Sequence, residues 1–459
     1  YESATSHNVT VRVTDSGGLT YDETFTINVT NVNEAPTGAD VTITISEDTS
    51  HTLTTANFGF SDVDAGDSLS AVRIDTVPGA GTLTLSGSTV TAGQVIALSD
   101  ITAGNLVFTP AANANGTSYA SCTFSVRDSH NAYDSGPNLL TVNVTAVNDA
   151  PVLVPQGLTY NTTEGAVPIT STVSALIGTS VTDSDSGALS GVAIFGMTGS
   201  GGTLEYSLDG TTWVSAGALS SSSALLLRST DQMRFTPDSN NGGTIQVSFR
   251  AWDQTTGSAG SKVDVSVTGG ATAFSTASDI ASCTIASVND APVLADTALT
   301  LTVAEDAGAP SGAVGSPVSA FTGGVTDVDS GASKGIAITG SNESNGTWYY
   351  TTNNGSTWTA VGTVSNTSAL LLADNANTRL YFSPGANFSG TSSGALTVRA
   401  WDQTSGAAGT KVSTASNGGT TAFSSATDVV DVTVTAVNDA PTDLSLSANT
   451  VAENAANGT

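Results

Sequence analysis

A five-residue motif, VNEAP or VNDAP, recurs four times in this chain and divides it into units. The motif ends at Pro36, Pro151, Pro292 and Pro441. Successive copies are 115, 141 and 149 residues apart in a chain of 459 residues, which is typical of tandem domains rather than of one large core. The predicted units are 1–36 (the end of a repeat), 37–151, 152–292 and 293–441 (complete repeats), and 442–459 (the first strand of a further repeat).

The sequence within the units alternates between apolar and polar residues, as half-buried strands do. Val9, Val11 and Val13 are one such series, and Val430, Val432 and Val434 are another. Strand-sized runs between turn signals, in units of this length, predict tandem all-β, antiparallel Greek-key β-sandwiches arranged end to end. We also expect single helical turns at residues 98–101 and 224–227.

The third and fourth units each carry a long insertion. The segment RAWDQT occurs at residues 250–255 and 399–404, and a stretch rich in Gly, Ser and Thr follows each copy. We expect residues 257–273 and 406–422 to form protruding hairpins or loops. They contain Lys262 and Lys411, two of the few cations, and are therefore predicted to be a lateral contact surface.

The charge balance is strongly acidic, with 40 Asp and Glu residues against 11 Lys and Arg residues and a net charge of −29. Such a chain does not bind nucleic acid by neutralising phosphates. Its carboxylates repel one another unless a cation lies among them. This composition favours a divalent cation as a partner.

Oxygen ligands recur around every unit boundary, in four groups. The linkers contribute Asn33, Glu34, Asn148, Asp149, Asn289, Asp290, Asn438 and Asp439. An Asp-x-Asp pair follows within the next unit: Asp62 and Asp64, Asp183 and Asp185, Asp327 and Asp329. A late strand ends in Asp128, Asp253 or Asp402, and an early strand carries Glu47, Glu164 or Glu305. Carboxylate and amide oxygens drawn from separate segments suit calcium, which accepts six to eight oxygens in irregular geometry.

Several of these segments resemble the cadherin family. The pair Tyr1-Glu2, TDSGG at residues 14–18 and NVNEAP look like the end of a cadherin repeat, and VAEN at 451–454 looks like the start of one. The resemblance implies a cadherin/Ig-like fold with Ca²⁺ between consecutive repeats, and it adds Glu2 to the ligands. It implies that the earlier repeat supplies its early Glu, the linker its Asn and acid, and the later repeat its Asp-x-Asp pair and strand-end Asp.

One position departs from the cadherin pattern. Two residues before the linker Asn, where cadherins have Asp, this chain has Asn31, Ala146, Ser287 and Ala436. We therefore expect fewer or weaker ions at each junction than in cadherins.

Two further resemblances point to bacterial surface proteins. The second unit, with GTLTLSG at residues 81–87, is similar to chondroitin-sulfate-proteoglycan-type repeats and to tandem repeats of bacterial surface proteins. The third and fourth units, which carry a YSxDGxxW-like hairpin and RAWD, resemble a repeat subtype of giant bacterial surface proteins.

No catalytic constellation is evident, so the chain is predicted not to be an enzyme. GTSSG at residues 390–394 matches a nucleophile elbow, but the last histidine, His130, lies far upstream of it. DSDSG and DVDSG open like EF-hand loops, but position twelve is Ile194 or Ile338 instead of Glu. Cys122 and Cys283 replace inward-facing aliphatic residues and are expected to be buried.

The predicted function is a calcium-rigidified extracellular stalk or adhesion segment of a large secreted or cell-surface protein. The expected partners are other repeats of the same chain, and neighbouring copies or surface glycans and proteins, with no membrane span in this segment. One alternative is a subunit of a surface layer or matrix filament, which lateral contacts would favour. Another is a carbohydrate-binding module of a polysaccharide-degrading system, which an exposed strip of aromatic residues would favour.

Overall fold

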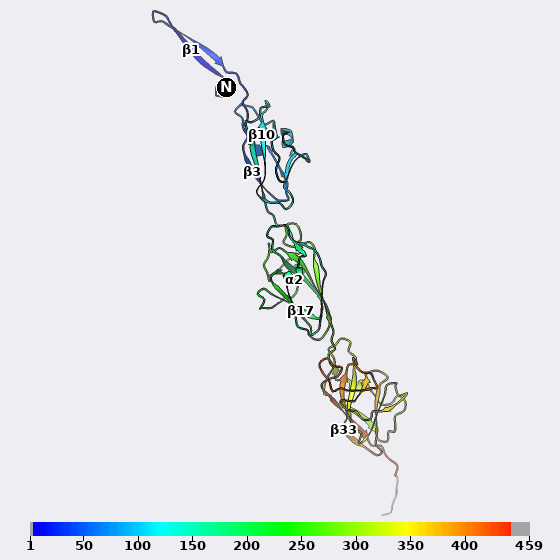
Figure 1. Cartoon of the computed structure of the whole chain (residues 1–459). Helices are drawn as coiled ribbons and strands as arrows, with labels where there is room; N and C mark the ends of the chain where they lie inside the picture. The colour runs from blue at the N-terminus through cyan, green and yellow to red at the C-terminus, as the bar shows by residue number, and fades with distance from the viewer. Residues whose placement is uncertain (1–2, 442–459) are drawn as a thin grey trace, which may run out of the picture.

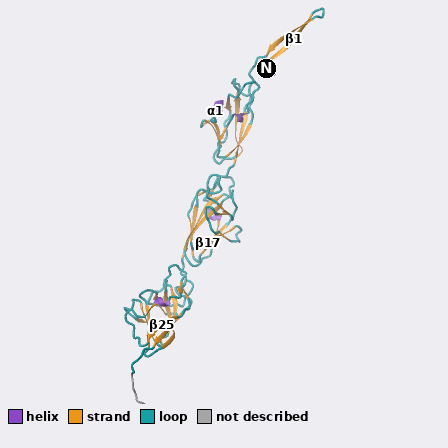
Figure 2. Ribbon diagram, turned by 180° about the vertical axis from the view of Figure 1, so that it is seen from behind, coloured by secondary structure: helices purple, strands orange, loops and turns teal. Residues whose placement is uncertain are grey.

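The structure is a computed structural model that describes residues 3–441. The units follow one another along an extended rod, and each sheet of the described residues lies within one unit (Figure 1). Strands make up nearly all of the regular structure, and the described helices are single turns (Figure 2). The predicted all-β fold of tandem sandwiches is confirmed. The strand expected in residues 442–459 lies outside the described residues.

The first unit consists of a single hairpin in the described residues, formed by β1 (Ser6–Thr14) and β2 (Thr20–Asn28). Val9 pairs with Phe25 and Val13 with Tyr21, and all four side chains are exposed. The alternation of apolar residues therefore predicted the strands correctly, although the described part of this unit has no second sheet to cover them.

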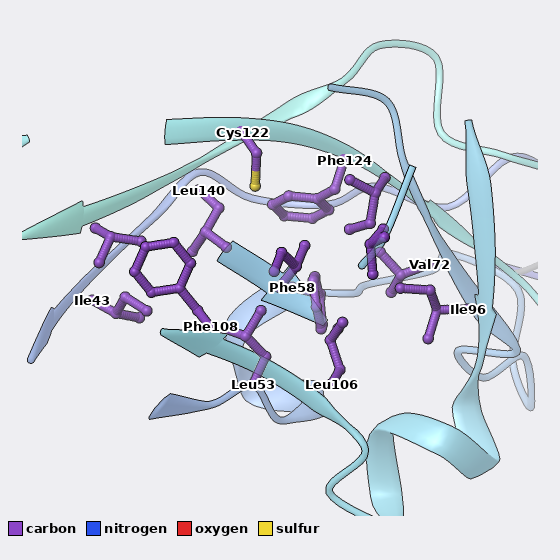
Figure 3. Close-up of a cluster of buried hydrophobic side chains, with 14 of the residues drawn as sticks. Ile43, Leu53, Phe58, Val72, Ile96, Leu106, Phe108, Cys122, Phe124 and Leu140 are labelled. Atoms are coloured by element: carbon purple, nitrogen blue, oxygen red, sulfur yellow. The ribbon is translucent and has the colours of Figure 1, made fainter. Parts of the chain in front are cut away.

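The second unit is a sandwich of two sheets. One sheet has the order β3-β11-β10-β5-β8: β3 (Val41–Ser46), β5 (Ala71–Ile74), β8 (Gln94–Ala97), β10 (Gly116–Arg127) and β11 (Asn138–Thr145). The other has the order β4-β9-β6-β7: β4 (His51–Thr52), β6 (Thr82–Leu85), β7 (Ser88–Thr89) and β9 (Leu106–Thr109). Between them Phe58, from the 3-10 turn η1 (Thr55–Phe58), meets Phe124 edge to face at 5.0 Å (Figure 3). Cys122 is buried in the same core, as predicted.

The third unit has a larger first sheet, of order β13-β23-β21-β16-β19-β22: β13 (Leu158–Thr163), β16 (Gly191–Gly199), β19 (Ala224–Arg228), β21 (Gly243–Trp252), β22 (Lys262–Val263) and β23 (Asp279–Ala286). The facing sheet is β14-β20-β17-β18: β14 (Ile169–Thr172), β17 (Gly202–Ser207), β18 (Val214–Ser215) and β20 (Gln232–Pro237). A short pair, β12 (Val152–Leu153) and β15 (Val181–Thr182), and the turn α2 (Val173–Ile177) complete it.

The fourth unit repeats this arrangement. Its first sheet is β25-β35-β33-β28-β31-β34: β25 (Leu299–Ala304), β28 (Gly335–Ser341), β31 (Ala369–Ala373), β33 (Gly390–Trp401), β34 (Lys411–Val412) and β35 (Asp428–Thr435). The facing sheet is β26-β32-β29-β30: β26 (Ser316–Pro317), β29 (Gly346–Thr351), β30 (Thr359–Ala360) and β32 (Arg379–Pro384). The short pair is β24 (Val293–Leu294) with β27 (Val325–Thr326), and η2 (Val318–Phe321) takes the place of α2.

Every complete unit has one parallel pair in an otherwise antiparallel fold. The opening strand runs parallel to the closing strand in β3–β11, β13–β23 and β25–β35. Because the first and last strands point the same way, the chain enters a unit at one end and leaves at the other. This arrangement lets the units follow one another in line.

The two insertions pack onto the sandwiches, so the prediction that they protrude is wrong. In the third unit, β22 adds to the edge strand β19, and the chain returns through Val265 and Phe274 over the outer face of the sheet. These residues bury Trp252, whose indole N–H donates to the carbonyl of Thr256 at 2.8 Å. The fourth unit repeats the arrangement around Trp401 and Phe423.

The expected helical turns gave one correct and one wrong result. Residues 98–101 lie in α1 (Leu98–Thr102), whereas residues 224–227 lie in strand β19. Leu225 and Leu227 face the main core, while Ala224 and Leu226 face the insertion. A strand that is buried on both faces has no polar alternation, which is why the run of apolar residues was misread.

Candidate metal centres at the unit junctions

The Asp-x-Asp pairs form tight turns at the end of each complete unit that faces the preceding one. In each pair the first carboxylate accepts a hydrogen bond from the second residue's backbone N–H, at 2.9 Å in Asp62–Asp64, Asp183–Asp185 and Asp327–Asp329. Asp is favoured here because its short side chain can close such a turn on its own backbone. The turn fixes one oxygen of the first Asp and leaves its other oxygen for a further partner.

The linker acid is held by the second Asp of each pair. The backbone N–H of Glu34 donates to Asp64 at 2.8 Å, and Asp149 and Asp290 donate likewise to Asp185 and Asp329 at 2.9 Å. These bonds attach the linker backbone to the later unit. They also bring the linker carboxylate close to the carboxylates of that unit.

The linker asparagine reaches the strand-end aspartate in all three junctions that the structure describes on both sides. The side-chain Nδ2 donates at 2.9 Å to Asp128 from Asn33, to Asp253 from Asn148, and to Asp402 from Asn289. The three aspartates are at most 3% exposed. The predicted link between linker and strand end therefore exists as a direct contact.

The early glutamates come from the earlier unit of each pair. Glu47 and Glu164 each accept the N–H of the linker valine, Val147 or Val288, at 2.6 Å, and both are less than a tenth exposed. The next residue is Asp48 or Gly165, at φ +58° and +62°, a conformation that only Gly and short polar residues tolerate well. This local turn directs the glutamate towards the junction.

Three carboxylates therefore meet across two of the junctions. At the second junction, one oxygen each of Glu47, Asp149 and Asp185 lie within 4.8 Å of one another. At the third junction, Glu164, Asp290 and Asp329 do the same. Each group combines the earlier unit, the linker and the later unit, as the sequence predicted for these residues.

Burial and the charges of neighbouring carboxylates raise the pKa values of three junction aspartates. Burial raises the pKa of Asp149, and so do the charges of Asp48, Asp185 and Glu47. Burial likewise raises the pKa of Asp183 and of Asp327, and the other junction carboxylates add to the shift. One buried oxygen in each of six junction carboxylates has no hydrogen-bond donor among the described residues: Asp62, Asp149, Asp183, Asp290, Asp327 and Glu164. A buried oxygen of this kind is stabilised by a cation, a proton or a hydrogen-bond donor such as water.

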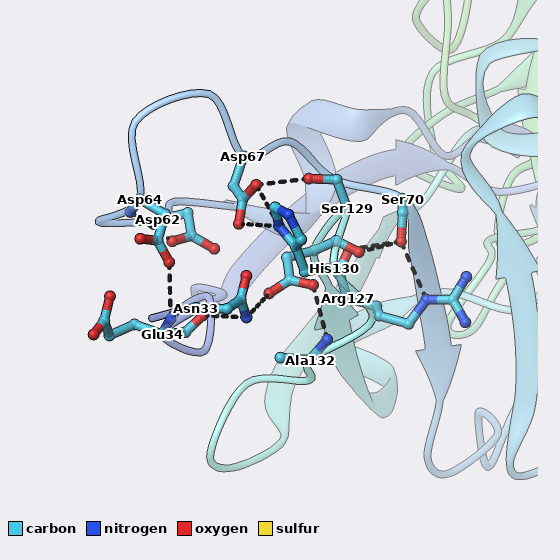
Figure 4. Close-up of polar contacts among 11 residues, drawn as sticks. Asn33, Glu34, Asp62, Asp64, Asp67, Ser70, Arg127, Ser129, His130 and Ala132 are labelled. Carbon is cyan, nitrogen blue, oxygen red and sulfur yellow. Dashed lines mark hydrogen bonds and ion pairs between the residues drawn. The ribbon is translucent and has the colours of Figure 1, made fainter. Parts of the chain in front are cut away.

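The first junction has a different carboxylate group, built from Asp62, Asp67 and Asp128 (Figure 4). Asp67 was missed in the sequence, although DVDAGD carries a third acid where the later units have Ala188 and Ala332. Its carboxylate pairs with His130 at 2.8 Å, and hydrogen bonds from His130 and Ser129 lower the pKa of Asp67. All three acids belong to the second unit, so this group does not span the junction.

The structure describes the fourth junction only in part. Glu305 accepts the N–H of Val437 at 2.8 Å, and Asn438 bonds weakly to the carbonyl of Asp439. The residues expected to complete this junction lie beyond residue 441, and Glu2 likewise lies outside the described residues. These assignments stay predictions.

Three of the five tryptophans are buried, Trp213 and Trp358 are partly exposed, and Lys262 and Lys411 are exposed residues whose amines bond to main-chain carbonyls. Trp252, Trp348 and Trp401 are at most 1% exposed. Lys262 donates to the carbonyl of Ala218, and Lys411 to that of Val361. Among the described residues, no helix is long and apolar enough to cross a membrane.

The chain is a tandem array of β-sandwiches, as its repeats predicted. Residues 33–145, which contain the second unit's sandwich, match the family model of the bacterial Ig domain. No curated protein sequence matches the chain.

Two solved structures illustrate the likeness to known proteins. Protocadherin gamma B2 extracellular cadherin domains 1–5 match with 14% identity and a TM-score of 0.43, over 95% of this chain and 68% of that one. A Ca²⁺-stabilized adhesin that helps an Antarctic bacterium reach out and bind ice matches with 13% identity and a TM-score of 0.18, over 95% of this chain and 83% of that one. The strand pairing, rather than these likenesses, defines the fold.

Proposed function

We propose that this chain is a calcium-rigidified extracellular stalk of a large cell-surface protein, with a structural and adhesive role. The observation that carries the proposal is the junction group of Glu47, Asp149 and Asp185, which recurs as Glu164, Asp290 and Asp329. In both, carboxylates from two successive units and their linker converge. A cation bound there joins the two units.

The donors at these junctions fit calcium. They are carboxylate and amide oxygens with no thiolate or imidazole among them, and several buried oxygens have no donor. Calcium prefers such hard oxygen ligands in irregular sets, whereas zinc favours nitrogen and sulfur. At the second junction, Glu47, Asp149 and Asp185 would hold one ion, and Asp183, Asp253 and Asn148 lie beside them as ligands for another.

The residues of the chain already position the ligands before any ion binds. Main-chain N–H groups orient one oxygen of Glu47 and one of Asp185. Bound calcium supplies the positive charge that offsets the repulsion among these carboxylates. Because the ligands come from both units, binding favours the aligned junction over a splayed one by mass action.

A calcium titration tests the proposal. We expect added calcium to raise the melting temperature and to lengthen the maximum dimension measured by small-angle X-ray scattering, and a chelator to reverse both. The double variant Asp183→Ala/Asp185→Ala should loosen the second junction and leave the third intact.

The control is Asp264→Ala/Glu343→Ala, which removes the same charge from two exposed positions away from the junctions. If the control and the junction variant respond alike to calcium, or if chelation changes neither length nor melting, these carboxylates only shape turns.

A further inference from the structure

The tips of the two insertions contact the linker that precedes their own unit. The backbone N–H of Ala150 donates to the carbonyl of Gly270 at 2.7 Å, and Asn148 Nδ2 donates to the carbonyl of Thr272 at 3.2 Å. The third junction repeats both bonds at the same lengths, from Ala291 to Gly419 and from Asn289 to Thr421. We call residues 269–272 and 418–421 the brace loops.

Each brace loop has a fixed shape and a buried anchor. In the third unit, Gly269 and Gly270 both have positive φ, +74° and +55°, and Gly269 N–H donates to the carbonyl of Phe274 at 2.9 Å. Phe274 is 7% exposed and packs in the second core with Trp252. The loop is therefore held by the sandwich and presents its carbonyl groups to the linker.

With the brace loop in place, each of four consecutive linker residues is hydrogen-bonded either to the unit before the linker or to the unit after it. Val147 bonds to Glu47 of the second unit, whereas Asn148, Asp149 and Ala150 all bond to the third. The change from one unit to the other takes place between two adjacent residues. This leaves very little free chain in which a hinge could form.

The first junction lacks this contact and serves as an internal control. The second unit has a short turn after its strand-end aspartate, closed by Ala132 N–H on Asp128 at 2.8 Å. Ala35, which corresponds to Ala150, has no backbone hydrogen bond to this turn within residues 3–441. There, Asn33 bonds to Asp128 and Glu34 to Asp64, both of the second unit.

We propose that the insertions are braces that lock the preceding junction through contacts that require no ion. The second and third junctions then keep their alignment better than the first when calcium is removed. The interaction surface is the pair of brace-loop carbonyls, and its partner is the Asn-Asp-Ala segment of the linker. This role differs from that of the carboxylates, because it acts through hydrogen bonds to the main-chain carbonyls of the brace loop.

The test is a pair of substitutions at Gly270. A Cβ at this position meets no atom within 4 Å, but the φ of +55° strongly disfavours a β-branched residue. Gly270→Val should therefore displace the brace loop, while Gly270→Asn should preserve it because Asn tolerates this conformation. Pulsed EPR on the full chain, with spin labels at exposed Ser88 and Thr211, reports the distance between the second and third units.

In chelator, we expect Gly270→Val to broaden the distance distribution between the second and third units, and Gly270→Asn to match the unsubstituted chain. A second label pair, at Thr211 and exposed Asn353, should show no change between the third and fourth units in either variant. If both distance distributions broaden, the third unit has unfolded. In that case the same comparison is made across the third junction with Gly419→Val and Gly419→Asn.

The brace proposal is overturned if, in chelator, each valine variant has the same width of distance distribution across its own junction as the unsubstituted chain. The same measurement with added calcium separates the two proposals. If calcium narrows none of the distance distributions, while the valine variants still broaden theirs in chelator, the calcium proposal fails and the brace proposal stands.

Discussion

The third and fourth units share strand order, insertion and junction chemistry, but they differ in how their interiors are filled. Leu204 in β17 and Trp348 in β29 occupy the same place, each opposite a phenylalanine of the neighbouring strand. Trp348 is fully buried and packs on Phe382 at 5.1 Å. Leu204 is smaller and, with Met233, lines an apolar cavity of about 80 Å³ that is open on one side.

The cavity divides the core of the third unit. Ile245, Cys283 and Ile285 form a small cluster apart from the main one, whereas the buried residues of the fourth unit form a single cluster between the sheets. A bulge in β33 also brings Ala395 into the fourth core. The junction ligands sit on turns and strand ends, so the interior can be filled in two ways without moving them.

Removing the indole of Trp348 should produce the largest effect. Trp348→Ala opens a cavity at a fully buried position, and we expect the fourth unit to lose about 3–5 kcal/mol of unfolding free energy. Differential scanning calorimetry of the full chain should show one transition moving down while the others stay. A loss as small as that of a surface substitution would show that the indole does not support the core.

Two matched variants sharpen this result. Trp348→Phe keeps a ring and removes an indole N–H that has no acceptor among the described residues, so it should cost less than Trp348→Ala. Leu204→Ala should cost less than Trp348→Ala, because it removes fewer atoms from a site that is already partly open.

Calcium removal should affect the third and fourth units alike, because their junctions contain the same residues. At a free calcium concentration about ten times Kd, one site adds about 1.4 kcal/mol of stability. Chelation should lower the melting transitions of both units by similar amounts. A large difference between the two would mean that the interior, and not the junction, controls ion binding.

Filling the cavity should produce a smaller gain. Leu204→Trp copies the residue of the fourth unit, and cavity-filling substitutions commonly add about 0.5–2 kcal/mol. The gain should appear as a higher melting temperature of the third unit alone. A lower temperature would show that the third sandwich, without the bulge of β33, is too narrow for an indole.

The smallest expected effect is that of pH on the calcium-free protein. Burial and neighbouring carboxylates raise the pKa of Asp183 and of Asp327 above the unfolded value, so the folded state binds more protons. The ionised carboxylates therefore lower the unfolding free energy most at neutral pH. This loss is relieved as the pH falls through the folded-state pKa. Melting temperatures of both units should rise slightly on mild acidification without calcium.

With calcium bound, acidification should lower the melting temperatures, because protons compete with the ion for the same oxygens. A fall in melting temperature on acidification without calcium would contradict the assigned shifts.

Much of the candidate site could be predicted because its residues lie at fixed places in a repeated pattern. The linker Asn, the Asp-x-Asp pair and the strand-end Asp recur in order, and the structure joins Asn148 to Asp253 and Asp149 to Asp185. Asp67 was missed because it occurs in one unit only, so recurrence gave no signal. The ion pair of Asp67 with His130 depends on two loops that are far apart in the chain.

The sequence by itself determined where the motif recurs, most of the strands and which acidic residues recur with it, because each is a local or periodic property. Alternation marks a half-buried strand wherever it occurs, and a recurring motif marks a recurring turn. Only the tertiary structure decided that the insertions fold back over Trp252 and Trp401, and that Leu204 lines an apolar cavity where the fourth unit has a buried tryptophan. These outcomes depend on which surfaces meet in three dimensions, since packing is a property of neighbours that are distant in the chain.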